Sequence, residues 1–354
     1  MSAFTSSDTR SKPERTILFI IDGLPAGIDG RMEIPGFTAL KQEAVSFEEV
    51  YLPLAAHPVL STSYPWACSI PNPVLMSGTI FIGQEGLADN LIQHSFTERP
   101  TAFYTNSWTY EAISKGFTEY IDFSEGKREH LFKDELPIEA ARQAIRTYNP
   151  EFIRIHCQGP GSAGHRSHRE TGQPYSNDIW ARDAPFIQQN RYVDGLLGDF
   201  VDWLKSEALW EDTVLVVMGD HGQCDTGGHS TYQPGGYTTQ LLIAGKNIRK
   251  GISYRYAEII DIAPTIAWLH QVEVPAFSTG RVLREIEEAL KINDEVIPWM
   301  KLLDENLLKY EQSKKEVEGL LTIDQIGLWH TTSAGADYPQ FVQQQINLLN
   351  HSPH

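Results

Sequence analysis

The chain has few cysteines, few positive charges and no long apolar run. Its three cysteines, Cys68, Cys157 and Cys224, are too few and too scattered to form the disulfide framework of a small secreted domain. Lys and Arg number 29 against 46 Asp and Glu, a formal net charge of -17, which excludes a generic nucleic-acid binder because such proteins present a basic surface. The longest apolar runs, such as 17–21 and 214–218, are far shorter than the roughly 20 residues that cross a bilayer. We therefore predict a cytoplasmic protein whose partners include neither nucleic acid nor a membrane.

The composition is typical of a soluble folded protein, and the chain divides into three parts. Hydrophobic residues make up 41% and charged residues 21% of the 354 residues, a balance that excludes a disordered chain and is enough for one large domain or two. The polar residues 1–14 predict a flexible arm without a secretory signal. Residues 15–285 predict the main domain. The charged, helical pattern of 286–354 predicts a C-terminal extension that could serve as an added layer or as a contact in a homo-oligomer.

Four short apolar runs predict strands buried on both faces, because they lack the alternation of a half-exposed strand. These runs are 16–22, 151–157, 213–220 and 238–245. Between them, 137–148 and 188–210 follow a helical period. The alternation predicts an α/β fold with a mostly parallel central sheet and helices on both faces. The stretch from Gly159 to Asp183 has no clear period, so we interpret it as a long loop within a cap-like insertion at about 159–187.

Two of the predicted strands end in an acid, at Asp22 and Asp220. The carboxyl ends of parallel strands meet at one edge of a sheet, where ligands of α/β proteins gather. Either Asp alone is more simply a turn-forming or helix-capping residue. Two carboxylates at one edge, however, repel each other unless a cation lies between them. Histidines follow two of the strand ends, and mixed imidazole and carboxylate ligands suit Zn, Mn or Fe; the histidines are His165, His168, His221 and His229.

A third segment that could take part in catalysis is the loop that contains Cys68 and Ser69. This loop leads into a predicted helix near Pro71. A thiol or hydroxyl at a helix N-terminus ionises more easily because of the local positive potential, especially beside a metal. The same position could cradle a phosphate. The structural alternative is an N-capping Ser69 next to a buried Cys68, and this segment alone does not decide between the two.

Five short motifs and a longer C-terminal one occur in a characteristic order along 15–285. They are Asp22-Gly23, Met76-Ser77-Gly78, Gly164-His165, Asp220-His221-Gly222, Gly228-His229 and the closing IIDIAPTIAWLHQVEVPAFSTGRVL. This ordered set resembles the alkaline phosphatase superfamily, especially its branch of phosphodiesterases, nucleotide pyrophosphatases, cofactor-independent phosphoglycerate mutases and GPI-anchor ethanolamine phosphate transferases. The resemblance covers most of residues 15–285 and implies an alkaline phosphatase-like catalytic domain.

The resemblance also implies one or two divalent metal ions per chain, with Zn or Mn as the expected metals. Asp22, Asp220 and His221 would hold one metal together with the nucleophile, and His165 and His229 would belong to a second. The family has an Asp four residues before the first of these histidines, where this chain has Gly161. The second site therefore has two ligands instead of three, unless a neighbour replaces the Asp; the candidates are Cys157, His168, Glu170, Asp178 and Asp183.

The resemblance leaves two candidates for the nucleophile. Counting back ten residues from Gly78, as the family spacing requires, gives Cys68, whereas matching the family's Pro-Asn pair to Pro71-Asn72 gives Ser69. Maturation of sulfatases to formylglycine needs C-x-P-x-R or a close variant. Here Cys68 is followed by Ser-Ile-Pro-Asn, which argues against formylglycine and against sulfatase activity.

These features predict a metal-dependent hydrolase of a small phosphate or phosphonate ester that works through a covalent intermediate on Cys68 or Ser69. Two alternatives remain open. The same fold could carry single-metal chemistry as a mutase, transferase, lyase or isomerase in a biosynthetic pathway, or the chain could be a non-catalytic relative that binds a ligand or partner. Product analysis separates the first alternative from hydrolysis, and the metal content tests the second.

Overall fold

The computed structural model describes residues 11–52, 91–229, 234–275, 278 and 280–287. Residues 1–288 form one compact unit and 289–354 a second. The second unit lies outside the described residues, as do most of the predicted arm, the Met76-Ser77-Gly78 motif and both nucleophile candidates, Cys68 and Ser69.

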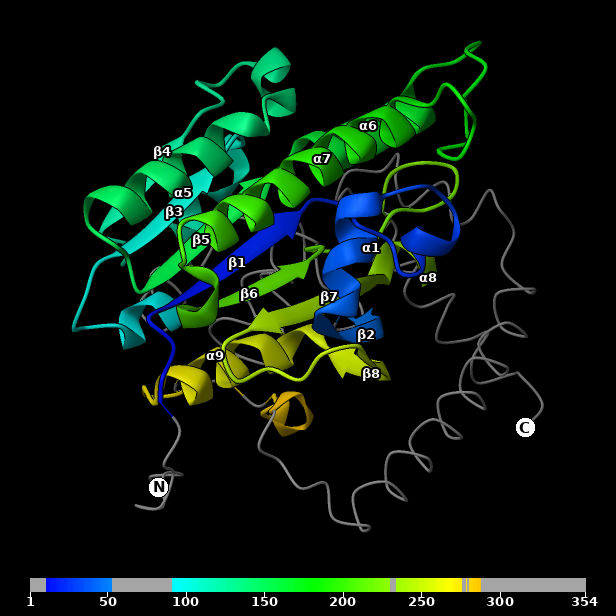
Figure 1. The fold of residues 1–354 in the computed structure, drawn as a ribbon. Coiled ribbons are helices and arrows are strands. Elements are labelled where there is room, and N and C mark those ends of the chain that lie inside the picture. Colours follow the sequence, from blue (N-terminus) through cyan, green and yellow to red (C-terminus); the bar gives the residue numbers. More distant parts are fainter. Residues whose placement is uncertain (1–10, 53–90, 230–233, 276–277, 279, 288–354) are drawn as a thin grey trace, which may run out of the picture. The chain divides into compact units, whose positions relative to one another are not determined.

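An eight-stranded sheet in the order β4-β3-β5-β1-β6-β7-β2-β8 forms the centre of the first unit (Figure 1). Its strands are β1 (Arg15–Ile21), β2 (Ala44–Tyr51), β3 (Thr101–Thr105), β4 (Glu119–Asp122), β5 (Phe152–Cys157), β6 (Thr213–Met218), β7 (Thr238–Gly245) and β8 (Ile252–Glu258). Within this sheet β7 runs antiparallel to both neighbours, β6 and β2, and the other pairings are parallel. The mostly parallel sheet predicted from the sequence is confirmed, and β1, β5, β6 and β7 match the four predicted strands.

Helices cover both faces of the sheet, as predicted. Side chains of α1 (Pro35–Gln42), α5 (Glu135–Thr147) and α7 (Pro185–Ser206) pack in one apolar cluster with Ile17 and Phe19 of β1. The opposite face, with Leu18 and Ile20, packs against α9 (Ile262–His270). Because β1 is buried along its whole length, its two alternating rows of apolar side chains each serve one cluster. The helices predicted at 137–148 and 188–210 are confirmed as α5 and α7, with ends displaced by a few residues.

The interpretation of 159–183 as loop is wrong for its first part, because Gly159–Arg169 forms helix α6. Three glycines and several polar residues hide any amphipathic period here, so local propensity predicts no helix. Tertiary contacts supply the missing stabilisation. Pro160 lies in the first turn, where proline fits, and the buried carboxylate of Asp134 accepts a hydrogen bond of 3.0 Å from the Gly159 N–H. Residues 170–184 are irregular, apart from turns.

The remaining α-helical segment, α8 (Pro234–Tyr237), is a single turn before β7. No helix within the described ranges combines the length and the apolar character that crossing a membrane requires.

Candidate metal centre

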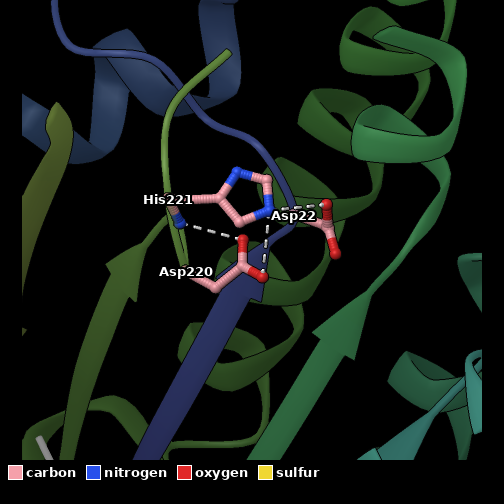
Figure 2. A group of neighbouring side chains, drawn as sticks. All are labelled: Asp22, Asp220 and His221. Carbon is pink, nitrogen blue, oxygen red and sulfur yellow. Dashed lines mark hydrogen bonds and ion pairs between the residues drawn. The ribbon is translucent and has the colours of Figure 1, made fainter. Parts of the chain in front are cut away.

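Asp22 and Asp220 meet at the carboxyl-end edge of the sheet, as the strand-end argument predicts. Asp22 directly follows β1 and Asp220 lies two residues beyond β6, and these two strands are parallel neighbours. Together with His221 they offer one ligand atom each, all within 4.8 Å of one another (Figure 2). The three side chains are nearly inaccessible to solvent, with at most 3% of each residue exposed. This group is the core of the candidate metal centre.

The tautomer of His221 leaves one ring nitrogen available to a metal. Its Nδ1 lies 2.7 Å from the carbonyl oxygen of Gly222, and a carbonyl can only accept, so Nδ1 carries the proton. In the neutral ring, which is the form that binds a metal, Nε2 then bears the lone pair. It lies 3.6 Å from Asp22 Oδ1 and 3.5 Å from Asp220 Oδ2, which is the arrangement of a histidine whose orientation is fixed by one nitrogen while the other binds metal.

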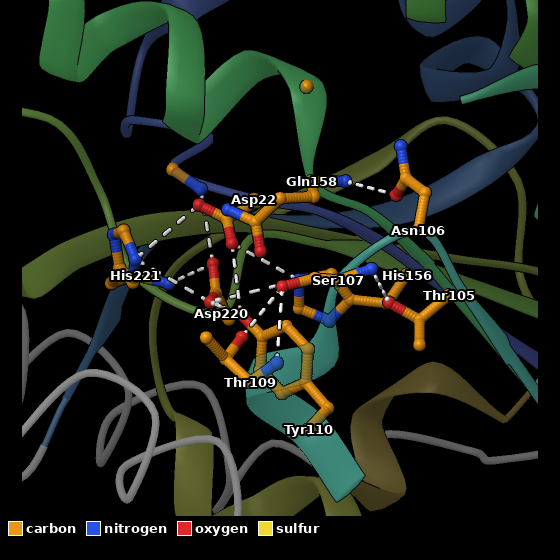
Figure 3. Close-up of polar contacts among 12 residues, drawn as sticks. Asp22, Thr105, Asn106, Ser107, Thr109, Tyr110, His156, Gln158, Asp220 and His221 are labelled. Atoms are coloured by element: carbon orange, nitrogen blue, oxygen red, sulfur yellow. Dashed lines mark hydrogen bonds and ion pairs between the residues drawn. The ribbon is translucent and has the colours of Figure 1, made fainter. Parts of the chain in front are cut away.

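Hydrogen bonds from the surrounding protein hold both carboxylates in place. Asp220 Oδ1 accepts from the backbone N–H groups of Gly23 and His221, each at 3.0 Å. The hydroxyl of Tyr110 lies 2.9 Å from Asp22 Oδ2 and 3.1 Å from Asp220 Oδ2 (Figure 3). Tyr110 therefore spans the two acids and orients them toward a common point.

His156 forms a further contact on the same side of the centre. Its Nε2 lies 3.2 Å from Asp22 Oδ2, and its ring packs against that of Tyr110 in a tilted arrangement with 3.9 Å between the centroids. Its Nδ1 lies 3.5 Å from a guanidinium nitrogen of the buried Arg154. Since arginine only donates, Nδ1 accepts and Nε2–H donates to Asp22. Burial lowers the pKa of His156 to about 3, so this donor is a neutral imidazole at neutral pH.

Tyr110 and His156 are not among the site residues predicted from the sequence. A signal for His156 was present, because Arg154 and His156 interrupt an otherwise apolar buried strand on alternate positions and so share one face. Since β5 pairs with β1 in the register Ile20 to His156, that face is the one from which Asp22 projects. Tyr110 comes from the short helix η3 (Trp108–Ile113), and no sequence pattern connects it to the metal ligands.

The electrostatics of the pair require a positive charge. Burial and the adjacent Asp220 raise the pKa of Asp22 well above its ordinary value. Burial is the largest single influence on Asp220 and opposes its ionisation, but the charge of His221 and the hydrogen bonds from the Gly23 N–H and the Tyr110 hydroxyl together outweigh it, so the pKa of Asp220 is lowered. The carboxylates in turn raise the pKa of His221 against the effect of its burial. A proton or a metal ion must therefore compensate the buried negative charge, and metal binding displaces that proton.

His165 and His229, predicted for a second metal, are brought to this centre. The ring centroids of His229 and His221 are 4.0 Å apart, and those of His229 and His165 are 4.9 Å apart. Helix α6 supplies His165, and the loop after β6 supplies His229. Within the described part of the chain, however, Asp22, Asp220 and His221 are the only His, Cys, Asp or Glu group of three that meets the distance expected for one ion. None of the predicted substitutes for the missing Asp completes a second group.

Two of those substitutes have other contacts. The side chain of Cys157 belongs to the apolar cluster on the opposite face of the sheet from His156. Glu170 forms an ion pair of 2.8 Å with Arg166 on α6.

The backbone at Gly161, where the family has its Asp, lies directly against Asp22, and a Cβ atom at this position would overlap Asp22 Oδ1. A side chain there is incompatible with the observed position of Asp22.

The donors of the described group fit a divalent metal. Two carboxylate oxygens and an imidazole nitrogen with a fixed tautomer are ligands that Zn and Mn both accept, and the buried negative charge needs a cation. An α/β sheet with such a centre at its strand ends defines a class of metal-dependent enzymes in which the ligands come from successive strand-end loops.

Comparisons with known proteins place the chain in a family. The sulfatase family model matches residues 85–272, more than half of the chain. The chain belongs to the sulfatase family, within the alkaline phosphatase superfamily, whose members are enzymes that act on phosphate or sulfate esters and use divalent metals. The predicted superfamily is confirmed.

Individual relatives carry several activities in their names. GPI ethanolamine phosphate transferase 2 of Debaryomyces hansenii is 29% identical over 150 residues, which cover 38% of this chain and 15% of the relative. The 2,3-bisphosphoglycerate-independent phosphoglycerate mutase of Rhodopirellula baltica is 36% identical over 107 residues, 27% of this chain and 18% of the relative. The matched segments thus span less than a fifth of these relatives.

A solved structure supports the fold over most of the chain. The phosphonate monoester hydrolase of Silicibacter pomeroyi is similar with a TM-score of 0.56 and 16% sequence identity. The match covers 79% of this chain and 78% of that protein. At this level of identity the similarity concerns the fold alone.

Proposed function

We propose that this protein is a metal-dependent hydrolase of a small phosphate or phosphonate ester that works through a covalent intermediate. The observation that carries the proposal is the convergence of Asp22, Asp220 and His221 Nε2 on one buried point at the strand ends. Buried carboxylates that repel each other are costly to a fold. Their presence is explained when a divalent cation binds between them.

A divalent cation bound there would lower the pKa of a nearby nucleophile and polarise the phosphorus centre. The chain's own residues prepare the position for it. Asp22 and Asp220 provide the negative charge, the hydrogen bond from His221 Nδ1 to the Gly222 carbonyl turns Nε2 toward them, and Tyr110 limits the movement of both acids. Burial of the group excludes water and strengthens every electrostatic interaction within it.

In the proposed reaction the side-chain oxygen of Ser69 or sulfur of Cys68 attacks phosphorus. The bond from phosphorus to the ester oxygen breaks, and the alcohol leaves with a proton. Water then attacks the phosphorylated side chain, which releases phosphate or phosphonate and restores the nucleophile. Both candidate nucleophiles lie outside the described residues, so their assignment depends on their position in the sequence and on the family spacing.

The substrate class is supported by the relatives and by the charge of the chain. The relatives in sequence are named for phosphate chemistry. The net charge of -17 disfavours large polyanions, because long-range repulsion slows their approach. We therefore propose a small ester with one phosphate or phosphonate group, acted on without a nucleic-acid or membrane partner.

Transfer to an alcohol instead of water is the second candidate function. The observation in its favour is that the relatives in sequence are named as transferases and as a mutase. Chemically the two functions differ only in the acceptor that attacks the covalent intermediate. An acceptor alcohol added to the reaction therefore separates them by the ratio of free to transferred phosphoryl group.

A panel of nitrophenyl esters tests the proposed function. We expect metal-loaded protein to release nitrophenol from a phosphate diester or a phosphonate monoester faster than from the sulfate ester. Mass spectrometry of acid-quenched protein should find the phosphoryl mass on the peptide that contains 68–69. Cys68→Ala and Ser69→Ala identify the nucleophile, because only one of them should abolish the labelled peptide. Preference for the sulfate ester, or turnover that both variants retain, would disprove the proposal.

A further inference from the structure

Gln223 is a buried polar side chain without a partner, beside the candidate metal centre. It lies two residues after His221 and is 1% exposed. Neither its Oε1 nor its Nε2 has a hydrogen-bond partner among the residues that the structure describes. Native proteins rarely leave both ends of a buried amide unsatisfied, since water would satisfy them in the unfolded chain. The amide therefore points to a group that the described side chains do not supply.

The surroundings of the amide are the backbones that carry the metal-site residues. Its Oε1 is 2.8 Å from the point that a Cβ at Gly23 would occupy. Its Nε2 likewise lies close to the point that a Cβ at Gly164 would occupy. Gly23 follows Asp22, and Gly164 precedes His165. Glycine at both positions leaves the room that the amide takes.

The loop that carries Gln223 also brings His229 back to the centre. The N–H of Cys224 donates to the carbonyl of Gly228 at 2.8 Å, which closes a tight turn between Gln223 and His229. Gly227 in this turn packs against the backbone of α6 at Gly164 and His168. The loop that carries Gln223 and His229 is therefore packed against α6, the helix that carries His165.

The position that supplies a carboxylate in the family cannot do so here. Residue 161 is glycine, and Asp22 Oδ1 occupies the place where its side chain would begin. His165 and His229 are close to each other but have no third ligand among the described His, Cys, Asp and Glu residues. Divalent cations also accept carboxamide oxygens as ligands. Such an oxygen comes from Asn or Gln, which are not among the His, Cys, Asp and Glu residues just considered.

We propose that Gln223 Oε1 is a ligand of a second divalent cation, which His165 and His229 also bind, in place of the missing carboxylate. The ligand set of two imidazoles and one amide is neutral. It therefore binds a cation more weakly than the site with Asp22 and Asp220, and it favours Zn over harder ions. The inference shares the metal centre of the proposed function but requires none of its chemistry.

Zinc binding to full-length protein tests the assignment without any measurement of turnover. We expect chelator-stripped wild-type protein to bind two zinc ions per chain, one tightly and one at least tenfold more weakly, by calorimetry and by elemental mass spectrometry after desalting. Gln223→Leu should bind only the tight ion. Gln223→Glu, which restores a carboxylate, should bind both and tighten the weaker site at least tenfold.

Two controls complete the experiment. Gln240→Leu changes another buried glutamine, on β7, whose Nε2 donates to Glu48, and it should leave both zinc ions bound. Asp220→Ala should lose the tight ion. Circular dichroism checks that each variant is folded, and Gln223→Met serves if the leucine variant is not.

A single zinc ion on the wild type, or two ions with unchanged affinity on Gln223→Leu and Gln223→Met, would overturn the assignment. Failure of the proposed function looks different. A protein that binds two zinc ions through Gln223 but hydrolyses no ester retains this inference and loses only the hydrolase.

Discussion

At the scale of single residues, the candidate site consists of three ligands and the groups that orient them. The sequence predicts Asp22, Asp220 and His221 because both acids follow buried parallel strands, whose carboxyl ends meet at the edge of the sheet where ligands gather. It does not predict Tyr110, which approaches from η3 and makes its contacts only in the folded protein. His156 is predictable only in part. Its strand is predicted from the sequence, but its contact with Asp22 follows only from the register of β5 against β1.

His156 is expected to support metal binding through Asp22. Replacing it with leucine removes the N–H donor that orients Asp22 Oδ2, and loss of such an orienting contact typically weakens metal affinity roughly 10- to 100-fold. His156→Gln keeps a donor at a similar reach and should recover most of the affinity. Competition with a fluorescent zinc chelator measures both variants. Equal affinities of His156→Leu and the wild type would contradict the assigned role.

Gly161 is expected to tolerate no side chain while Asp22 keeps its position. In Gly161→Ala the new Cβ overlaps Asp22 Oδ1, so the carboxylate must move, and we predict a loss of metal affinity of about tenfold or more. Gly195→Ala on α7 is the matched control, because a Cβ there meets no atom within 4 Å. The control should keep its metal and gain about 0.5–1 kcal/mol in free energy of unfolding from helix propensity. Unchanged zinc affinity in Gly161→Ala would be inconsistent with the crowded position.

At the scale of elements, helix α6 depends on a buried acid at its N-terminus. Asp134 accepts hydrogen bonds from the Gly159 N–H and the Asn106 amide through Oδ1, and from the Gln189 amide through Oδ2. The sequence of α6 alone predicts a loop, because its glycines disfavour helix and the contacts that stabilise it come from segments distant in the sequence. By contrast, α5 and α7 carry apolar stripes of their own and are predictable.

The stability of the protein should reflect the titration of Asp134. Burial raises its pKa to about 6 from an ordinary 3.8, so ionisation costs more in the folded state than in the unfolded chain. The contribution of Asp134 to the free energy of unfolding is therefore fully present below about pH 4 and is lost as the pH rises through about 6. In Asp134→Asn the loss is absent. We predict that the stability of the variant relative to the wild type increases between pH 4 and pH 7 by on the order of 3 kcal/mol.

Urea unfolding of metal-free protein at several pH values measures this difference. Asp212→Asn is the control, because Lys246 lowers the pKa of that half-buried acid, and the change for this variant should be small and of opposite sign. A relative stability of Asp134→Asn that does not depend on pH would mean that Asp134 is not a strained acid in the folded state.

At the scale of the whole molecule, the sequence predicts the centre of the sheet better than its edges. The runs at β1, β5, β6 and β7 are apolar throughout because both their faces are covered. The strands β4 and β8 lie at the two edges of the described sheet and are only partly buried along most of their length, so their patterns do not stand out. The same difference applies to the site, because groups that follow the ends of central strands are predictable, whereas Tyr110, which comes from the short helix η3, is not.

The central claim is that Asp22, Asp220 and His221 form a metal centre on which ester hydrolysis depends. Its most direct test is the recovery of activity toward a nitrophenyl phosphonate or phosphate diester when Zn or Mn is added to chelator-stripped protein. We predict recovery by at least 100-fold in the wild type and in Asp212→Ala, and none in Asp220→Ala that remains folded. Activity that survives complete removal of metal, or equal recovery in Asp220→Ala, would contradict the account.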